Sequence, residues 1–389
     1  MSTVCELDRQ FIAPAYARFP VTFVRGEGCT LYDEGGKAYI DMGSGIAVSA
    51  LGYGDAAWTD AVCAQAKALS HVSNLYYTAP QAELAKLLCE LSGMKRVFFG
   101  NSGAEANECA IKVARKYAAD KYGEAVRPVI VTMENSFHGR TLATLAATGQ
   151  DVFHHTFGPF PQGFRHVPPN DTASLEKALA SGDVCAVLLE TVQGEGGVCR
   201  LTDAYLKAAR ELTEALDILL MIDEVQTGNG RTGKPFSYQW VDITPDVATT
   251  AKGLAGGLPM GACLLGEKVK DVLTPGSHGS TFGGNPICAA AALSVQRRLT
   301  DTFLAEVTAK GGYISRELSA VPGVTSVSGR GLMLGVQSGR DAGGLVRALL
   351  ERGVVALTAK TKLRLLPPLT ISWPELERAV GIIKEELQQ

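Results

Sequence analysis

The sequence predicts an α/β fold, with a mostly parallel central sheet in a large domain and a smaller α+β domain beside it. Two observations predict this class. Continuous apolar runs, which are typical of strands buried on both faces, alternate with segments of helical period. Glycine-rich loops follow several of these runs, and α/β folds place their sites at such strand ends.

The order of the elements follows from these patterns. A hairpin is predicted over 31–41, with its turn at Gly35 and Gly36. The large domain alternates two kinds of segment, with strands predicted at 96–100, 129–132, 184–190 and 218–223 and helices at 105–122 and 203–215. Beyond about residue 290 the pattern becomes that of the smaller domain, with helices predicted at 289–307, 344–351 and 374–387 and strands at 331–336 and 362–366.

Composition excludes several classes of protein. Hydrophobic residues make up 46% of the chain and charged residues 20%, which is typical of a globular enzyme. The net charge of −3 gives no basis for binding nucleic acid or an anionic membrane. Nine cysteines without a Cys-x-x-Cys pattern, and a first segment without a long apolar stretch, predict a cytoplasmic location. We expect no metal site, because the one close histidine pair, His154 and His155, points apart in an extended segment.

Asp223 and Lys252 carry the clearest chemistry. Asp223 ends an apolar run, and Lys252 is the only charged residue between Asp246 and Glu267. A lysine in such a close-packed segment is more easily neutral, and only a neutral amine attacks a carbonyl. An amine that forms a Schiff base and an acid that keeps a ring nitrogen protonated are what a pyridoxal phosphate enzyme needs. Taken alone, each residue has an ordinary alternative, a loop cap for Asp223 and a surface charge for Lys252.

The segment Asn101-Ser-Gly-Ala-Glu-Ala-Asn follows a strand and begins a helix. The backbone N–H groups of Ser102, Gly103 and Ala104 are therefore expected at a helix N-terminus, which attracts phosphate. The alternative is a helix capped by Ser102 or its neighbour, with Glu105 as the capping-box partner. From this motif alone the capped helix is the better supported of the two.

Two further segments present groups that suit a cofactor or a substrate. Phe137 can lie on a flat ring and Arg140 can clamp a carboxylate, with a core anchor and a surface ion pair as the alternatives. His138 between them is interpreted as a hydrogen-bonded packing residue. Arg364 lies in an apolar strand and needs a carboxylate, either from a ligand or from a static pair with an acid such as Glu195.

The order of these motifs along the chain resembles the class III pyridoxal-phosphate aminotransferases. The resemblance extends from about Arg25 to the last helix, and it also includes the Gln193-Gly-Glu-Gly-Gly and Ser280-Thr-Phe-Gly-Gly-Asn-Pro segments. It implies an aspartate-aminotransferase-like (fold type I) enzyme with pyridoxal 5′-phosphate as cofactor. It also implies that residues 1–50 join the small domain, that 51–285 form the large cofactor-binding domain, and that 286–389 form the C-terminal small domain.

The resemblance further implies roles for individual residues. Lys252 and Asp223 are the catalytic pair, and the implied contacts to cofactor come from Ser102, Gly103, Ala104, Phe137, Asp223, Val225, Gln226, Lys252 and Thr281. Thr281 is implied to reach the phosphate of the neighbouring subunit, which makes a homodimer with shared active sites. The implied contacts to substrate come from Arg140, Glu195, Ser280 and Arg364, with Glu195 and Arg364 as a switchable pair.

The implied reaction moves the δ-amino group of N2-acetyl-L-ornithine to 2-oxoglutarate, a step of arginine biosynthesis. His138 fits such an enzyme better than an ornithine aminotransferase, in which a bulkier aromatic is usual. Thr191, where proline is common, and a short N-terminal arm depart from the family pattern. The alternatives are transfer from succinyldiaminopimelate, succinylornithine, ornithine or 4-aminobutyrate, a glutamate-semialdehyde aminomutase, and a non-catalytic regulator.

Overall fold

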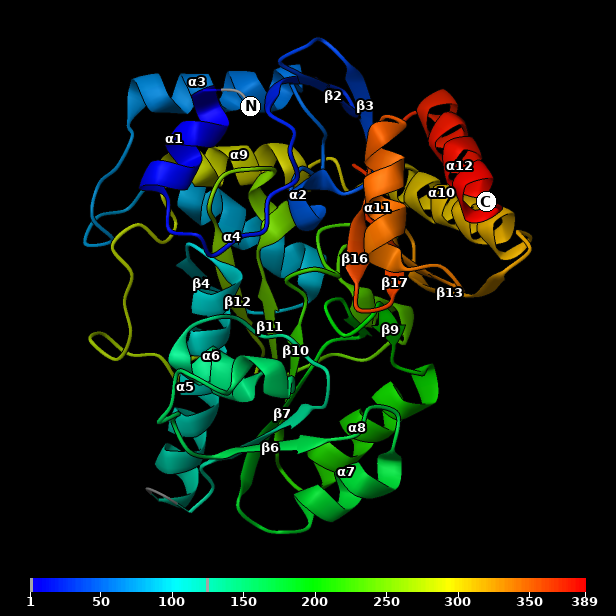
Figure 1. Ribbon diagram of the computed structural model, residues 1–389. Helices are drawn as coiled ribbons and strands as arrows, with labels where there is room; N and C mark the ends of the chain where they lie inside the picture. The colour runs from blue at the N-terminus through cyan, green and yellow to red at the C-terminus, as the bar shows by residue number, and fades with distance from the viewer. Residues whose placement is uncertain (1–2, 124–125) are drawn as a thin grey trace.

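A seven-stranded sheet forms the centre of the larger lobe (Figure 1). The computed structural model describes residues 3–123 and 126–389. In spatial order the strands are β4 (Arg96–Gly100), β12 (Gly261–Leu265), β11 (Val247–Thr250), β10 (Leu219–Asp223), β7 (Val184–Leu189), β5 (Val129–Met133) and β6 (Phe164–Val167). Only β12 runs antiparallel to its neighbours, so the predicted mostly parallel sheet is confirmed.

Helices cover both faces of this sheet because its strands are apolar on both sides. In β10, Leu219 and Met221 join one core while Leu220 and Ile222 join the other. Helix α5 (Gly103–Tyr122) packs on the first face. The remaining helices of this lobe are α3 (Ala56–Ala68), α4 (Ala79–Ser92), α6 (Leu142–Ala147), α7 (Thr172–Leu179), α8 (Asp203–Ala215) and α9 (Pro286–Gln296).

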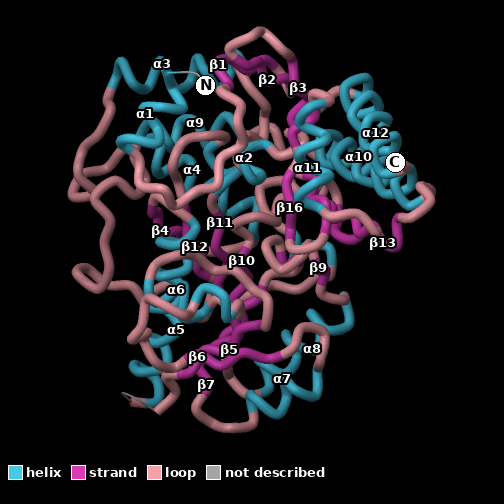
Figure 2. The backbone as a smooth tube through the Cα atoms, in the orientation of Figure 1, coloured by secondary structure: helices cyan, strands magenta, loops and turns pink. Residues whose placement is uncertain are grey.

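The smaller lobe combines the two ends of the chain. One sheet orders β13 (Val324–Arg330), β14 (Met333–Ser338), β17 (Lys362–Leu365) and β16 (Leu357–Ala359). Another orders β1 (Phe23–Glu27), β2 (Thr30–Asp33), β3 (Ala38–Asp41) and β15 (Val354–Val355), so that an early strand pairs with a late one. Helices α10 (Asp301–Ser319), α11 (Ala342–Glu351) and α12 (Trp373–Leu387) pack around them (Figure 2). One core joins residues of 29–51 to residues of 295–387, while the exact domain boundaries stay a prediction.

The predicted hairpin is confirmed, since β2 and β3 pair antiparallel around Gly36 with a φ of 80°. The predicted helix 289–307 is wrong. The chain leaves α9 at Gln296 and begins α10 at Asp301, because Thr300 caps the new helix with its hydroxyl, which accepts the N–H of Phe303 at 3.3 Å. The shorter elements are α1 (Thr3–Phe11), α2 (Ser44–Ala47), β8 (Val192–Gln193), β9 (Cys199–Arg200) and the 3₁₀ turns Asp151–Phe153, Ser237–Trp240 and Lys252–Ala255. None of the described helices has the length and apolar character to span a membrane.

Candidate active site

A cavity of about 410 Å³ opens at the carboxyl edge of the large sheet. Loops leaving β4, β5, β7, β10 and β11 reach it, together with Met260 before the antiparallel β12. Ten of the predicted site residues line this cavity: Ser102, Gly103, Ala104, Phe137, Arg140, Glu195, Asp223, Val225, Gln226 and Lys252. Convergence of strand ends explains why segments distant in sequence meet here.

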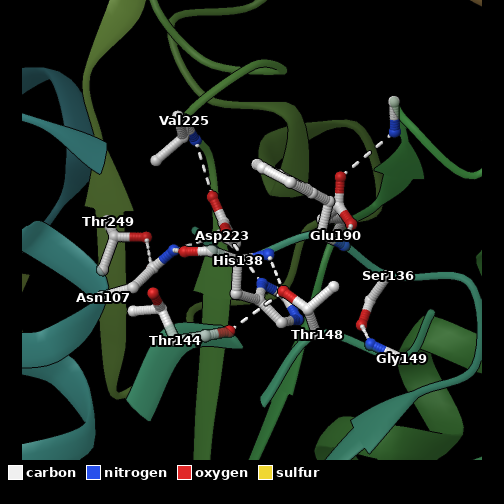
Figure 3. Close-up of polar contacts among 12 residues, drawn as sticks. Asn107, Ser136, His138, Thr144, Thr148, Gly149, Glu190, Asp223, Val225 and Thr249 are labelled. Atoms are coloured by element: carbon white, nitrogen blue, oxygen red, sulfur yellow. Dashed lines mark hydrogen bonds and ion pairs between the residues drawn. The ribbon is translucent and has the colours of Figure 1, made fainter. Parts of the chain in front are cut away.

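Asp223 is fixed by donors from three directions (Figure 3). Its Oδ2 accepts a hydrogen bond from Asn107 Nδ2 at 2.7 Å and lies 2.8 Å from His138 Nδ1. Its Oδ1 accepts the backbone N–H of Val225 at 3.0 Å. Asp223 is only 3% exposed, so these contacts hold its carboxylate in one place. The interpretation of His138 as a hydrogen-bonded packing residue is confirmed.

The support behind Asp223 was not predicted. Asn107 also donates to the carbonyl of His138 at 2.8 Å, and its own oxygen accepts the hydroxyl of Thr249 at 2.6 Å (Figure 3). Asn107 lies in the second turn of α5 and Thr249 in β11. The available signal was a polar residue, Asn107, on the otherwise apolar buried face of a helix.

Lys252 presents its amine to the cavity. No hydrogen bond or ion pair joins this amine to another described residue, although the side chain is partly accessible from the cavity. Burial lowers the pKa of the Lys252 amine below its usual value, and nearby Arg364 lowers it further. Glu195 and Asp223 act in the opposite direction without outweighing the burial. Lys252 therefore combines cavity exposure with a reduced affinity for protons.

The N-terminus of α5 lies at the same cavity. Ser102 caps the helix, with its hydroxyl accepting the N–H of Glu105 at 3.1 Å, and Glu105 Oε2 accepts a hydrogen bond from Asn101 Nδ2 at 2.9 Å. The cap by Ser102 is thus confirmed, whereas the capping box with Glu105 is wrong, because Glu105 contacts Asn101 and not the N–H of Ser102. A capped N-terminus does not compete with an anion site. The N–H groups of Gly103 and Ala104 belong to the first turn, which has no partners within the helix, and both residues line the cavity.

Glu195 and Arg364 form an ion pair beside the cavity. Arg364 Nη1 donates to Glu195 Oε1 at 2.5 Å and approaches Gln226 Oε1 at 3.4 Å. Arg364 is 4% exposed, whereas the side chain of Glu195 is 30% exposed. Burial disfavours the charged form of Glu195, but Arg364 outweighs this effect and holds the pKa of the carboxyl below its usual range. This geometry agrees both with a static ion pair and with a pair that opens when a substrate binds.

Glu190 is a third acid at the cavity, beside Asp223 and Glu195, and no role was predicted for it. Its two oxygens accept the backbone N–H groups of Phe137 at 2.9 Å and of Gly194 at 3.1 Å. Burial raises the pKa of Glu190 to about 7, and the charge of Asp223 adds to this rise. Glu190 thus ties the loops that carry Phe137 and Glu195 to the end of β7.

Ser280 and Thr281 lie outside this cavity. They line a separate hollow with Gly100, Asn101 and Glu105, and Asn101 Nδ2 donates to Ser280 Oγ at 3.2 Å. Within one chain the structure therefore does not bring Thr281 to Lys252. The prediction that Thr281 serves a neighbouring subunit stays a prediction.

Comparison with known proteins identifies the family. Residues 11–387 match the model of the aminotransferase class-III family. This chain is a class III aminotransferase. An acetylornithine aminotransferase of Haemophilus ducreyi is 53% identical, with 99% of this chain and 98% of that protein covered. One of Methanothermobacter thermautotrophicus is 45% identical over 98% of this chain and 97% of that protein.

Solved structures of class III aminotransferases and related enzymes share this fold. The crystal structure of ornithine aminotransferase from Toxoplasma gondii has a TM-score of 0.94 at 31% identity, covering 99% of this chain and 94% of that one. The N-acetylornithine aminotransferase of Stenotrophomonas maltophilia has a TM-score of 0.85 at 36% identity, covering 98% and 97%. The predicted family and fold type are confirmed.

The cofactor of a class III aminotransferase, pyridoxal 5′-phosphate, fits the residues present. An unpaired amine that faces the cavity, a fixed carboxylate and a helix N-terminus surround one cavity. The backbone is also shaped for close approach. A Cβ on Gly103 would lie 2.7 Å from the side chain of Val225, so this position has no space for a larger residue.

Proposed function

We propose that this enzyme moves the δ-amino group of N2-acetyl-L-ornithine to 2-oxoglutarate, giving N-acetyl-L-glutamate 5-semialdehyde and L-glutamate in arginine biosynthesis. The relatives named acetylornithine aminotransferase support this substrate. The observation that carries the proposal is the pair of arginines around Lys252. Arg140 lines the cavity without an ion pair to any described residue, whereas Arg364 is neutralised by Glu195. Such a site has one arginine, Arg140, that is free to bind a carboxylate. The second, Arg364, becomes free when Glu195 moves away.

Lys252 is proposed as the catalytic base and Asp223 as its electrostatic partner. Pyridoxal phosphate, when bound, supplies an aldehyde for the amine and a ring that withdraws electrons from the adjacent carbon. Lys252 Nζ takes a proton from the δ-carbon of the donor and, in the second half-reaction, delivers one to C2 of 2-oxoglutarate. The lowered pKa of Lys252 supports this role, because a neutral amine is needed to accept the proton.

The other cavity residues are proposed to hold the reactants. Ser102, Gly103 and Ala104 offer N–H groups to a phosphate, and Phe137 offers a ring face. Asp223 would hold the ring nitrogen protonated, and Val225 and Gln226, which also line the cavity, would complete the cofactor contacts. These assignments rest on the position of each residue at the cavity.

The arginines are proposed to select the substrates. Arg140 binds the α-carboxylate of the acylated donor, with Ser280 close by in the assembled site. The acetylated amine of the donor carries no charge, so the Glu195–Arg364 pair can remain closed beside it. The carboxylate next to the keto group of 2-oxoglutarate instead displaces Glu195 and binds Arg364. The 30% exposure of the Glu195 side chain supports its movement away.

An assay of the purified protein with 2-oxoglutarate tests the substrate. N-acetylornithine should be the best donor in a panel with ornithine, 4-aminobutyrate and succinyldiaminopimelate. Ornithine belongs in the panel because a structural neighbour with a TM-score of 0.94 is an ornithine aminotransferase. A preference for another donor overturns the proposed substrate. Turnover of glutamate semialdehyde without any added keto acid would instead indicate an aminomutase.

A homodimer with shared sites is proposed as the active unit. Several large apolar side chains are exposed in one chain, among them Leu75 at 86%, Tyr77 at 104% and Phe282 at 59%, the last next to Thr281. Such residues favour burial against a second copy. Inactive Lys252→Ala and inactive Thr281→Ala proteins should regain activity after subunit exchange, through hybrids with one intact site. Exchange without recovery contradicts the sharing. All nine cysteines are free thiols, which supports a reducing compartment such as the cytoplasm.

A further inference from the structure

The guanidinium of Arg140 lies between two aromatic rings. Its central carbon is 3.9 Å from the ring centroid of Phe153 and 5.5 Å from that of Phe137. The two rings meet edge to face, with centroids 6.1 Å apart. No carboxylate or carbonyl oxygen among the described residues accepts a hydrogen bond from this guanidinium. Its contacts are with the faces of the two aromatic rings. The closer contact comes from Phe153, which no sequence motif singled out.

The turn that carries Phe153 is anchored to the loop that carries Arg140. Phe153 ends the 3₁₀ turn Asp151–Phe153, which follows Gly149 and Gln150. The N–H of Gly149 donates to Ser136 Oγ at 3.0 Å (Figure 3), and Gln150 Nε2 donates to the carbonyl of Ser136 at 3.1 Å. Ser136 is fully buried. Phe153 is therefore held in a defined position relative to Arg140.

Stacking on an aromatic face orients an arginine without occupying its donors. The ring attracts the positive charge from above, while the N–H groups point outward in the plane of the guanidinium. An ion pair with a protein carboxylate would instead occupy one edge of the group. A guanidinium held over a ring at the wall of a cavity thus keeps its N–H groups available for two parallel hydrogen bonds to an incoming carboxylate.

We propose that Phe153 is a positioning residue that determines affinity for the carboxylate of the amino donor. It acts through Arg140, by holding the guanidinium over its ring while no acceptor of the described residues occupies the N–H groups. The inference rests on the proposed function, in which Arg140 binds that carboxylate. It adds the segment 149–153 to the substrate site, although Phe153 itself is not a lining residue of the cavity.

Substitutions at Phe153 and at a matched position test the role. Phe153→Leu keeps an apolar side chain and removes the ring face, whereas Phe153→Tyr keeps the ring. Phe157→Leu is the matched control, since Phe157 lies in the same segment, is 59% exposed and has no recorded ring contact with Arg140. The ligand is N-acetylnorvaline, which carries the carboxylate but lacks the reacting amine, and its dissociation constant with the holoenzyme is measured by calorimetry.

Phe153→Leu should weaken N-acetylnorvaline roughly 3- to 30-fold, the range expected for a lost cation–π contact. Phe153→Tyr and Phe157→Leu should bind it as the unmodified enzyme does. With N-acetylputrescine, a donor that lacks the carboxylate, kcat/KM should be the same in all four proteins. In steady state with N-acetylornithine, the change should appear in KM and not in kcat.

Each contrary outcome has a distinct meaning. Unchanged affinity in Phe153→Leu overturns the inference, and so does an equal loss with N-acetylputrescine, because the residue then supports the fold alone. Arg140→Ala separates this from the proposed function: if that variant binds N-acetylnorvaline normally, the role of Arg140 itself is wrong. If Arg140→Ala weakens binding and Phe153→Leu does not, only the role of Phe153 fails. In the double variant, Phe153→Leu should add no further loss to Arg140→Ala.

Discussion

Lys252 has a backbone conformation that its side chain does not favour. Its φ of 46° lies in the left-handed region, where a residue with a Cβ costs about 1–2 kcal/mol. Such strain persists where the surrounding structure imposes it, and it concentrates at functional sites. Here it turns the chain directly after β11, so that the amine enters the cavity instead of continuing along the sheet edge.

The lowered pKa of Lys252 predicts early reaction with an amine reagent. Only the neutral amine reacts, and a lowered pKa means that the neutral form appears at lower pH. In cofactor-free protein, the pH at which acetic anhydride labels half of Lys252 should fall below the ordinary lysine value of 10.5. Peptide mass spectrometry measures each lysine, with the exposed Lys67 as reference. A midpoint at or above 10.5 would contradict the desolvation of this amine.

Asp223 should matter for turnover more than for attachment of the cofactor. Replacing it by alanine removes the acceptor of three hydrogen bonds. It also removes the charge that is proposed to pair with the ring nitrogen of the cofactor. We expect kcat to fall roughly 100-fold or more. Borohydride should still fix the cofactor on Lys252, as peptide mapping can establish. Asp60→Ala, at an exposed helix position, is the control and should leave kcat unchanged. Normal turnover in Asp223→Ala would exclude the electrostatic role.

Asp223 could be predicted because it ends a recognisable apolar run, and Lys252 because it is the only charged residue between Asp246 and Glu267. Asn107 and Thr249, which hold Asp223 from behind, could not be predicted in this way. These two residues are separated by 142 positions, and their 2.6 Å hydrogen bond exists only because α5 crosses β11. A side chain at a strand end can be predicted locally, whereas its buried partner depends on packing.

Strand β12 shows a similar limit for a whole element. Its residues Gly261 to Leu265 are all buried, and the run was not predicted as a strand. The local sequence does not show whether such a run lies parallel or antiparallel to its neighbours in a sheet. In the structure, β12 lies antiparallel between β4 and β11. The four strands that were predicted in the large domain are apolar runs at 96–100, 129–132, 184–190 and 218–223. Their spatial order, with β12 second, follows from long-range pairing.

The break between α9 and α10 predicts a measurable capping contribution. Thr300→Ala removes the hydroxyl that accepts the N–H of Phe303, and the free energy of unfolding should fall by about 1 kcal/mol. Denaturant titration measures the change. Thr302→Ala, two positions into the same helix and exposed, is the matched control and should have a smaller effect. Equal losses in both variants would mean that helix propensity, not capping, sets this boundary.

The Glu195–Arg364 pair joins the two lobes of the molecule. Glu195 lies in a loop between β8 and β9 beside the large sheet, and Arg364 lies in β17 of the small lobe. The sequence predicted that Glu195 and Arg364 are partners, but it could not show that the ion pair forms. Whether the pair forms depends on how β17 packs against the large lobe, and no local sequence pattern predicts that packing. The proposed displacement of Glu195 by 2-oxoglutarate would therefore break a contact between the two lobes.

Arg364→Ala should separate the two half-reactions. Loss of a charge-assisted contact should weaken 2-oxoglutarate roughly 30- to 1,000-fold in apparent specificity, with a small effect on N-acetylornithine. Arg140→Ala should instead weaken the acylated donor. Stopped-flow absorbance follows each half-reaction by itself. Equal losses for donor and keto acid in Arg364→Ala would assign this residue a structural role only.

The hydroxyl of Ser44 donates to the carbonyl of Leu366 at 2.6 Å, across 322 positions of sequence. During translation at about 5–20 residues per second, roughly 15–65 seconds pass before that partner is synthesised. The strands of the large sheet emerge in the meantime and can pair with one another. Cys29, Ile40 and Met42 cannot, because their core requires residues beyond 295. The segment that carries Cys29, Ile40 and Met42 is therefore expected to complete its packing only after the residues of 295–387 have been synthesised.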